Sequence, residues 1–174
     1  ADKSIFDILQ VSIFEADPFD YVYEQIWAKE GIYDNNSQRM AFYMQVVHRN
    51  ADLDYLESGW DVYTLMYLHE RIINKALANW STDTASQIGF NTYSTPPSEI
   101  SGNDFMLISM SFITHQDQRP FFDMWGIDYS EDASNQIDYF DFVETPMWYY
   151  PSENANGEST AEPIAVDGFG VWPY

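Results

Sequence analysis

The sequence predicts a mainly α-helical protein, a bundle of about five to seven helices with an irregular or short-stranded C-terminal tail. Apolar residues recur with a period near 3.6 residues as far as about Ile137, which is typical of amphipathic helices. Beyond Ile137 this period disappears, and aromatic residues, Gly and Pro become frequent. We therefore expect a helical domain over residues 1–142 and an aromatic tail over residues 143–174 that packs on it.

The N-terminal part of the chain carries signals for several helix starts. Ser4 is a suitable cap for the first helix, and Asp17 followed by Pro18 predicts the start of the second. Asn36 or Ser37 is expected to cap a third helix. The side chains expected on one face of that helix are Met40, Tyr43, Val46 and Val47.

The clearest helical pattern begins at Asp61, directly after Gly59 and Trp60. Its apolar residues keep a period close to that of an α-helix. They are Val62, Leu65, Met66, Ile72, Ile73, Ala76 and Leu77. The segment Ser81–Gly102 that follows is polar and contains two consecutive prolines, so we expect a loop there.

Further helix starts are expected in the second half of the chain. Asn103 or Asp104 is predicted to cap a helix that carries Phe105, Leu107, Ile108 and Phe112. Ser130, with acidic residues in the first turn after it, predicts the start of another short helix. The residues from Val143 to Tyr150 are β-prone and aromatic, so a short strand is expected in the tail.

The segment Asp117–Ile127 predicts a short helix that ends sharply. Pro120 stands near its start, where a missing N–H is tolerated. Gly126 is suited to the left-handed position that follows a helix end. The apolar side chains expected on one face are Phe121, Met124 and Trp125. We expect this segment to form a packed helix–loop corner.

The charge of the chain excludes some classes of partner. Seven basic residues stand against 28 acidic ones, which gives a net charge of −21 at pH 7. Nucleic acid and anionic membrane surfaces would be repelled. High solubility, calcium binding and a cationic partner all remain open explanations of the acidity. The sequence has no run of apolar residues long enough to span a membrane.

Catalytic and metal-binding motifs are not found in the sequence. The absence of Cys excludes thiolate zinc sites and cysteine nucleophiles. His69 and Glu70 begin like the zinc motif H-E-x-x-H, but Ile73 occupies the position of the second histidine. We therefore interpret His69-Glu70 as a solvated helix edge. His48 and His115 stand far from it in the chain, so no catalytic or metal residue is predicted here.

The segment Asp117–Gly126 resembles the D-L-x-P-F-F-x-x-W-G element of enhancin-type, mucin-degrading zinc metallopeptidases. This group includes the bacterial immunomodulating metalloproteases and the viral enhancins. The matching residues are Asp117, Pro120, Phe121, Phe122, Trp125 and Gly126. Gln118 and Arg119 depart from the pattern, because Leu and a small polar residue are usual at their positions.

Upstream segments resemble further elements of this family in the same order. Gly59, Trp60 and Asp61 match a G-W-D segment that precedes an apolar helix. Asp104-Phe105, with Ser111 after it, resembles the portion that precedes the P-F-F-x-x-W-G element. The resemblance covers about 40–137, and we expect its matched residues to be structural rather than to contact substrate.

The resemblance implies that the chain is the C-terminal helical part of a larger metallopeptidase. In that family H-E-x-x-H and a downstream glutamate ligand lie N-terminal to the matched elements, and this sequence lacks both. The implied function is a non-catalytic lobe of a secreted or cell-surface bacterial enzyme that cleaves glycoproteins such as mucins. Its implied partners are the upstream catalytic part of the same polypeptide and the glycoprotein substrate. Zinc is expected in the parent protein and not in this chain.

A stand-alone module that binds carbohydrate or protein remains the alternative. Exposed aromatic side chains of the tail would supply its binding surface, since ring faces stack on sugars. The candidates are Trp148, Tyr149, Tyr150 and Trp172. An upstream H-E-x-x-H in the parent reading frame would favour the metallopeptidase over this alternative.

Overall fold

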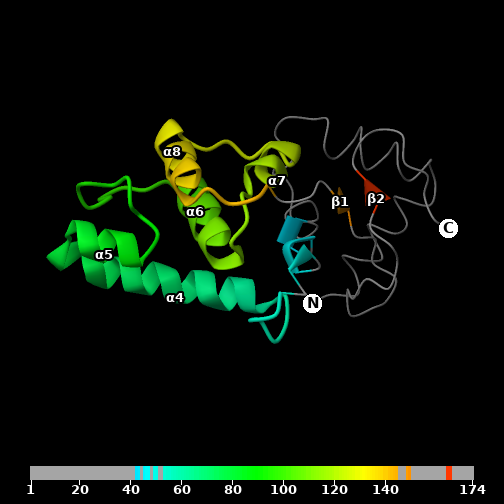
Figure 1. Cartoon of the computed structure of the whole chain (residues 1–174), viewed down its shortest axis with the longest axis horizontal. Coiled ribbons are helices and arrows are strands. Elements are labelled where there is room, and N and C mark those ends of the chain that lie inside the picture. The colour runs from blue at the N-terminus through cyan, green and yellow to red at the C-terminus, as the bar shows by residue number, and fades with distance from the viewer. Residues whose placement is uncertain are drawn as a thin grey trace.

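The computed structural model describes residues 53–144 continuously, together with residues 42–43, 45–47, 49–50, 148–149 and 164–165. Within these ranges the chain is mainly helical, as the sequence predicted (Figure 1). The helices are α4 (Asp61–Ala76), the 3-10 helix η3 (Leu77–Asn79), α5 (Thr82–Gln87), α6 (Gly102–Thr114), α7 (Arg119–Met124) and α8 (Glu131–Phe140). The helices predicted after Ser4 and Asp17 lie outside the described residues.

Helix α6 lies at the centre of the described part, with α4 packed against it on one side and α8 on another (Figure 1). Its own composition is mostly apolar, so it buries side chains toward both neighbours. The buried residues that these three helices contribute to the core are Val62, Met66 and Ile73 of α4, Leu107, Ile108 and Met110 of α6, and Ala133 and Ile137 of α8. Removal of this apolar surface from water is the main force that holds the helices together.

Helix α4 has the start that the sequence predicted, but the predicted apolar face is wrong in part. Ile72 is 50% exposed, and the buried positions of the helix include His69. Ile72 and Ile73 are neighbours in the sequence, and successive residues lie about 100° apart around a helix. Only Ile73 of that pair is therefore buried in the core.

Helix α5 corrects the prediction of a continuous loop over Ser81–Gly102. Ser81 caps it, because the hydroxyl oxygen of Ser81 accepts a hydrogen bond from the Thr84 N–H at 3.2 Å. Helix α5 is six residues long. Ala85 is buried, and the apolar residues that anchor it to the core, Ile88 and Phe90, come after the helix ends. The six residues of α5 are mostly polar, so they show no helical period of apolar residues from which the helix could be predicted.

The start of α6 also lies earlier than predicted. The cap is Ser101 rather than Asn103 or Asp104, since the Ser101 hydroxyl accepts from the Asp104 N–H at 3.1 Å. Gly102 is the first helical residue, a position that the prediction assigned to the loop. Helix α8 follows the prediction, with Ser130 as its cap and Glu131 in its first turn.

The described part of the tail contains two short strands. Strand β1 (Trp148–Tyr149) pairs antiparallel with β2 (Ile164–Ala165), with Trp148 opposite Ala165. This agrees with the short strand predicted there. The division into a domain over 1–142 and a tail packed on it stays a prediction, because most of the tail lies outside the described residues.

Candidate functional site

Three aromatic residues of the P-F-F-x-x-W-G element, Phe121, Phe122 and Trp125, meet Phe42 in one cluster, which we call the aromatic corner. All four side chains are fully buried. The Phe42 ring stacks on Phe121 with 5.1 Å between centroids and meets the Trp125 ring edge-on at 5.7 Å. Such ring pairs add to the gain from burial. The corner thus joins α7 to the helical residues around Phe42.

The backbone of α7 explains why the motif contains proline and glycine. Pro120 lies in the first turn, where a helix needs no N–H donor. Gly126 has a φ of 62°, so the chain turns sharply after the helix, as predicted. The Gly126 N–H donates to the Asp123 carbonyl and the Ile127 N–H to the Phe122 carbonyl, both at 3.0 Å. This pair of bonds is the Schellman arrangement, and it returns Ile127 to the core.

The three residues of the G-W-D segment, Gly59, Trp60 and Asp61, have different structural roles. A Cβ on Gly59 would lie 1.8 Å from the carbonyl oxygen of Val47, so only glycine permits this close approach of two backbones. Trp60 is half-exposed. The Asp61 carboxylate accepts hydrogen bonds from the N–H groups of Glu57 and Ser58, each at 3.0 Å. The segment fixes the entry of the chain into α4.

A set of polar contacts connects the ends of α6, α7 and α8, and we call it the helix-end network. Its residues are Asp104, Asp117, Arg119, Ser130, Ser134 and Asp138. The Asp104 carboxylate is buried and accepts from the Ser130 N–H and the Ser130 hydroxyl, both at 2.8 Å. The same Ser130 hydroxyl oxygen accepts from the Ala133 N–H at 3.2 Å and so caps α8. One carboxylate therefore joins the N-terminal turn of α6 to the start of α8.

A second part of the helix-end network surrounds Arg119. Its guanidinium pairs with Asp117 at 2.7 Å and with Asp138 of α8 at 2.7 Å, and it donates to the Ser134 hydroxyl at 3.0 Å. The hydrogen bond with Asp117 raises the pKa of Arg119 above its ordinary value, and Asp138 adds to this. Asp117 also donates its N–H to the Val143 carbonyl at 2.9 Å.

Gln118 has defined partners although it departs from the family pattern. Its side chain is almost fully buried, and its amide nitrogen donates to the Thr114 hydroxyl at 2.9 Å. The Gln118 N–H donates to the Ser111 hydroxyl at 3.2 Å. Gln118 and Arg119 are therefore integrated into the turn between α6 and α7. Their contacts with α6 and α8 depend on the tertiary fold, and Arg119 pairs in addition with the neighbouring Asp117.

Beside the helix-end network lies an open recess of about 270 Å³. Its lining residues are Tyr93, Pro96, Pro97, Ser98, Glu99, Ile100, Asp104, Ser130 and Asp132. Burial raises the pKa of Tyr93 to about 12, and the charges of Asp104 and Asp132 contribute. The Tyr93 hydroxyl therefore stays protonated. With three carboxylates in its lining, the recess is suited to hydrogen-bond donors rather than to anions.

His69 is buried, which corrects the interpretation of His69-Glu70 as a solvated edge; Glu70 alone is exposed. The Nε2 atom of His69 lies 2.8 Å from the Ile88 carbonyl oxygen, which can only accept, so Nε2 carries the proton. Nδ1 then accepts from the Ser109 hydroxyl at 2.8 Å. Burial lowers the pKa of His69. His69 thus ties α4 to α6 as a neutral side chain.

The described residues do not bring metal ligands together. Among them, no group of three or more His, Asp or Glu side chains is arranged to hold a metal ion. His115 is exposed and has a φ of 52° at the C-terminal end of α6. His48 lies outside the described residues. Every helix in the described ranges is too short or too polar to cross a bilayer.

In sequence and in structure the chain is similar to part of a bacterial metallopeptidase. The immunomodulating metalloprotease of Pseudomonas aeruginosa is 37% identical to it over 181 residues. The match covers 99% of this chain and 19% of the relative. The predicted resemblance is confirmed, and it extends over nearly the whole chain rather than over 40–137 alone. No protein-family model matches the chain.

Solved structures of the same relative have the same fold. The IMPa metallopeptidase from Pseudomonas aeruginosa is 34% identical with a TM-score of 0.69, and the match covers 98% of this chain and 20% of that one. Its complex with T-antigen is 35% identical with a TM-score of 0.69, and the match covers 100% of this chain and 20% of that one. Its complex with an O-glycopeptide is 36% identical with a TM-score of 0.70, and the match covers 98% of this chain and 20% of that one. The chain thus spans about a fifth of the length of these relatives.

Proposed function

We propose that this chain is a non-catalytic lobe of a secreted zinc endopeptidase that acts on glycoproteins such as mucins. The observation that carries this proposal is the 37% identity over 99% of the chain to a metalloprotease of which the chain matches only 19%. In the proposed parent, the lobe follows the catalytic part in the sequence, supports it and shapes one wall of the substrate cleft. Bacterial secretion or cell-surface display is part of the same proposal.

The roles of the motif residues support a non-catalytic lobe. Metallopeptidase chemistry needs zinc ligands that activate water, together with a general base. The chain contains no H-E-x-x-H. Phe121 and Trp125 are fully buried, and the Asp104 carboxylate is engaged by Ser130. These residues are therefore occupied in holding the fold, and the zinc and its ligands belong to the rest of the proposed parent.

The substrate class is proposed from the relative. Its solved complexes contain T-antigen in one case and an O-glycopeptide in another. A glycosylated peptide is therefore the substrate class that we propose for the parent. Proline residues and a protonated tyrosine line the acidic recess of this chain, which makes the recess a candidate for the wall of a cleft that meets hydroxyl-rich groups.

The proposal is tested by comparing the full-length parent with the 174-residue chain. We expect the parent to cleave an O-glycosylated peptide and to lose this activity with a zinc chelator. The isolated chain should cleave nothing and should retain far less than one zinc per chain after dialysis. Cleavage by the isolated chain, or a parent gene that encodes no upstream H-E-x-x-H, would contradict the proposal. Binding of the isolated chain to a glycan array would then support the stand-alone module.

A further inference from the structure

The side of helix α4 that faces away from α6 carries an apolar surface, which we call the outer face of α4. Its residues are Trp60, which stands at the N-cap position of the helix, together with Thr64, Tyr67, Leu68, Arg71, Ile72, Asn74 and Lys75. The four apolar side chains among them are between 45% and 60% exposed. Single exposed apolar residues are ordinary on a protein surface, but here they follow one another along one helix. Helix α4 thus carries apolar side chains both on the face that packs in the core and on its solvent-exposed outer face.

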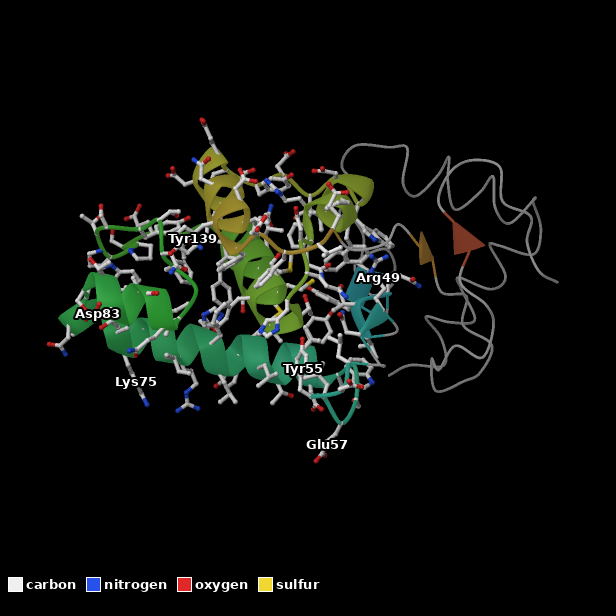
Figure 2. The ribbon with its side chains drawn as sticks, viewed as in Figure 1. Arg49, Tyr55, Glu57, Lys75, Asp83 and Tyr139 are labelled. Carbon is white, nitrogen blue, oxygen red and sulfur yellow. The ribbon has the colours of Figure 1, made fainter. Side chains whose placement is uncertain are left out.

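The outer face of α4 is also basic within an acidic chain. Arg71 and Lys75 are the only Lys or Arg residues between positions 50 and 118, while the whole chain has a net charge of −21. Between residues 53 and 144, the ion pairs are those of Arg119, so neither Arg71 nor Lys75 takes part in one there. The Arg71 guanidinium lies 5.7 Å from the Tyr67 ring centre. Lys75 points away from the other helices (Figure 2).

We propose that the outer face of α4 docks against another part of the parent metallopeptidase, on a surface that presents carboxylates around apolar side chains. This rests on the proposed function. Interfaces between domains of one chain combine apolar and polar groups, as this face does. Its basic residues complement an acidic partner. The relatives supply about four fifths of their length outside the matched region, which is the source of that partner.

A second copy of this chain is a poorer occupant. Two chains that each carry a net charge of −21 repel one another strongly at low salt. The two basic residues of the face do not offset that repulsion. Another domain of the same polypeptide is held nearby by the chain itself, so it docks at a high effective concentration.

The absence of cysteine from the chain permits a direct test of coverage. The variant Ile72→Cys is made in the 174-residue chain and in the full-length parent, and its reaction with a maleimide is followed by peptide mass spectrometry. We expect labelling at position 72 to be roughly tenfold or more slower in the parent, because it must await local opening of the interface. Tyr139→Cys is the matched control, since Tyr139 of α8 is exposed to a similar degree. Its labelling rates should agree within about twofold.

Charge reversal tests the chemistry of the partner. In the parent that carries Ile72→Cys, the added changes Arg71→Glu and Lys75→Glu should restore fast labelling, whereas Arg71→Lys should keep it slow. If the isolated chain does not fold, the ratio of native to urea-unfolded labelling in the parent at positions 72 and 139 gives the same comparison.

Equal labelling of position 72 in both proteins would overturn the proposal. Slow labelling in the isolated chain that depends on concentration, with a dimer mass in light scattering, would also overturn it and would identify a second copy as the occupant. Peptidase activity is measured separately on the same parent. Protection at position 72 in a parent without chelator-sensitive activity would therefore contradict the proposed function while supporting the docking surface.

Discussion

The aromatic corner and the helix-end network each contain residues of the predicted family motifs, but they hold the molecule in different ways. Phe121, Phe122 and Trp125 are stabilised by removal from water, which depends on buried area and tolerates small shifts. Asp104 and Arg119 act through hydrogen bonds of defined length and direction. The corner therefore packs α7 against the helical residues around Phe42, and the network connects α6 and α7 to α8.

The two regions are expected to differ in the substitutions that they tolerate. Replacement of any ring in the aromatic corner by a small side chain should be strongly destabilising, because it leaves a cavity. The network contains both buried and exposed members, since the Asp117 side chain is 6% exposed and that of Asp138 61% exposed. The contribution of each carboxylate should therefore follow its burial rather than its charge. Two-state unfolding of the isolated chain allows substitutions in the two regions to be compared as free energies.

The largest effect is expected for Trp125→Ala in the aromatic corner. Loss of a fully buried indole should lower the free energy of unfolding by roughly 3–5 kcal/mol. Urea titration followed by circular dichroism measures it. The control is Trp60→Ala, which removes a half-exposed indole and should lower the value by about 1–2 kcal/mol, clearly less than Trp125→Ala. Equal effects of the two substitutions would show that the corner is not packed as described.

A smaller loss is expected for Gly59→Ala, at the contact between the G-W-D segment and the helical residues near the corner. The new Cβ would overlap the carbonyl oxygen of Val47, so the backbone must shift, at a cost of about 1–3 kcal/mol or more. Gly102→Ala is the matched control, because a Cβ added at Gly102 would meet no atom within 4 Å. That change should be neutral or stabilise by about 0.5 kcal/mol. Thermal unfolding of the pair distinguishes steric overlap from helix propensity.

The substitution Asp104→Ala breaks the buried part of the helix-end network. It leaves the Ser130 N–H without its acceptor, so we expect a loss of about 1–3 kcal/mol in the free energy of unfolding. Asp128→Ala removes the same charge from an exposed side chain and serves as the control for relief of negative repulsion. If Asp104→Ala is as mild as this control, the connection between α6 and α8 does not stabilise the fold.

The smallest effect is expected for Asp138→Ala, at the exposed end of the network. Its ion pair with Arg119 is short, but the Asp138 side chain is 61% exposed. Such pairs contribute about 0–1 kcal/mol, and roughly 1 M salt should remove the difference from the wild-type chain. Unfolding measured at low and at high salt tests this. A large loss that persists at high salt would mean that Arg119 requires both carboxylates.

Local signals allowed several elements to be predicted. Ser130 followed by acidic residues marks the start of α8, and Gly126 marks the end of α7. Helix α5 was missed because its core contacts come from Ile88 and Phe90 after the helix, rather than from a periodic face. The motif residues were found through a family resemblance, but composition and spacing alone assigned them no contacts.

The helical class, the ends of the clearest helices and the resemblance to metallopeptidases can be predicted from the amino-acid sequence, because they depend on neighbours a few residues apart and on ordered motifs. The burial of His69 depends on the tertiary fold, since its partners Ser109 and Ile88 lie 40 and 19 residues away in the chain. The same holds for the contact of Arg119 with α8 and for the outward direction of Ile72. Burial and hydrogen bonding depend on which distant segments meet, and the local period of a helix does not specify its neighbours.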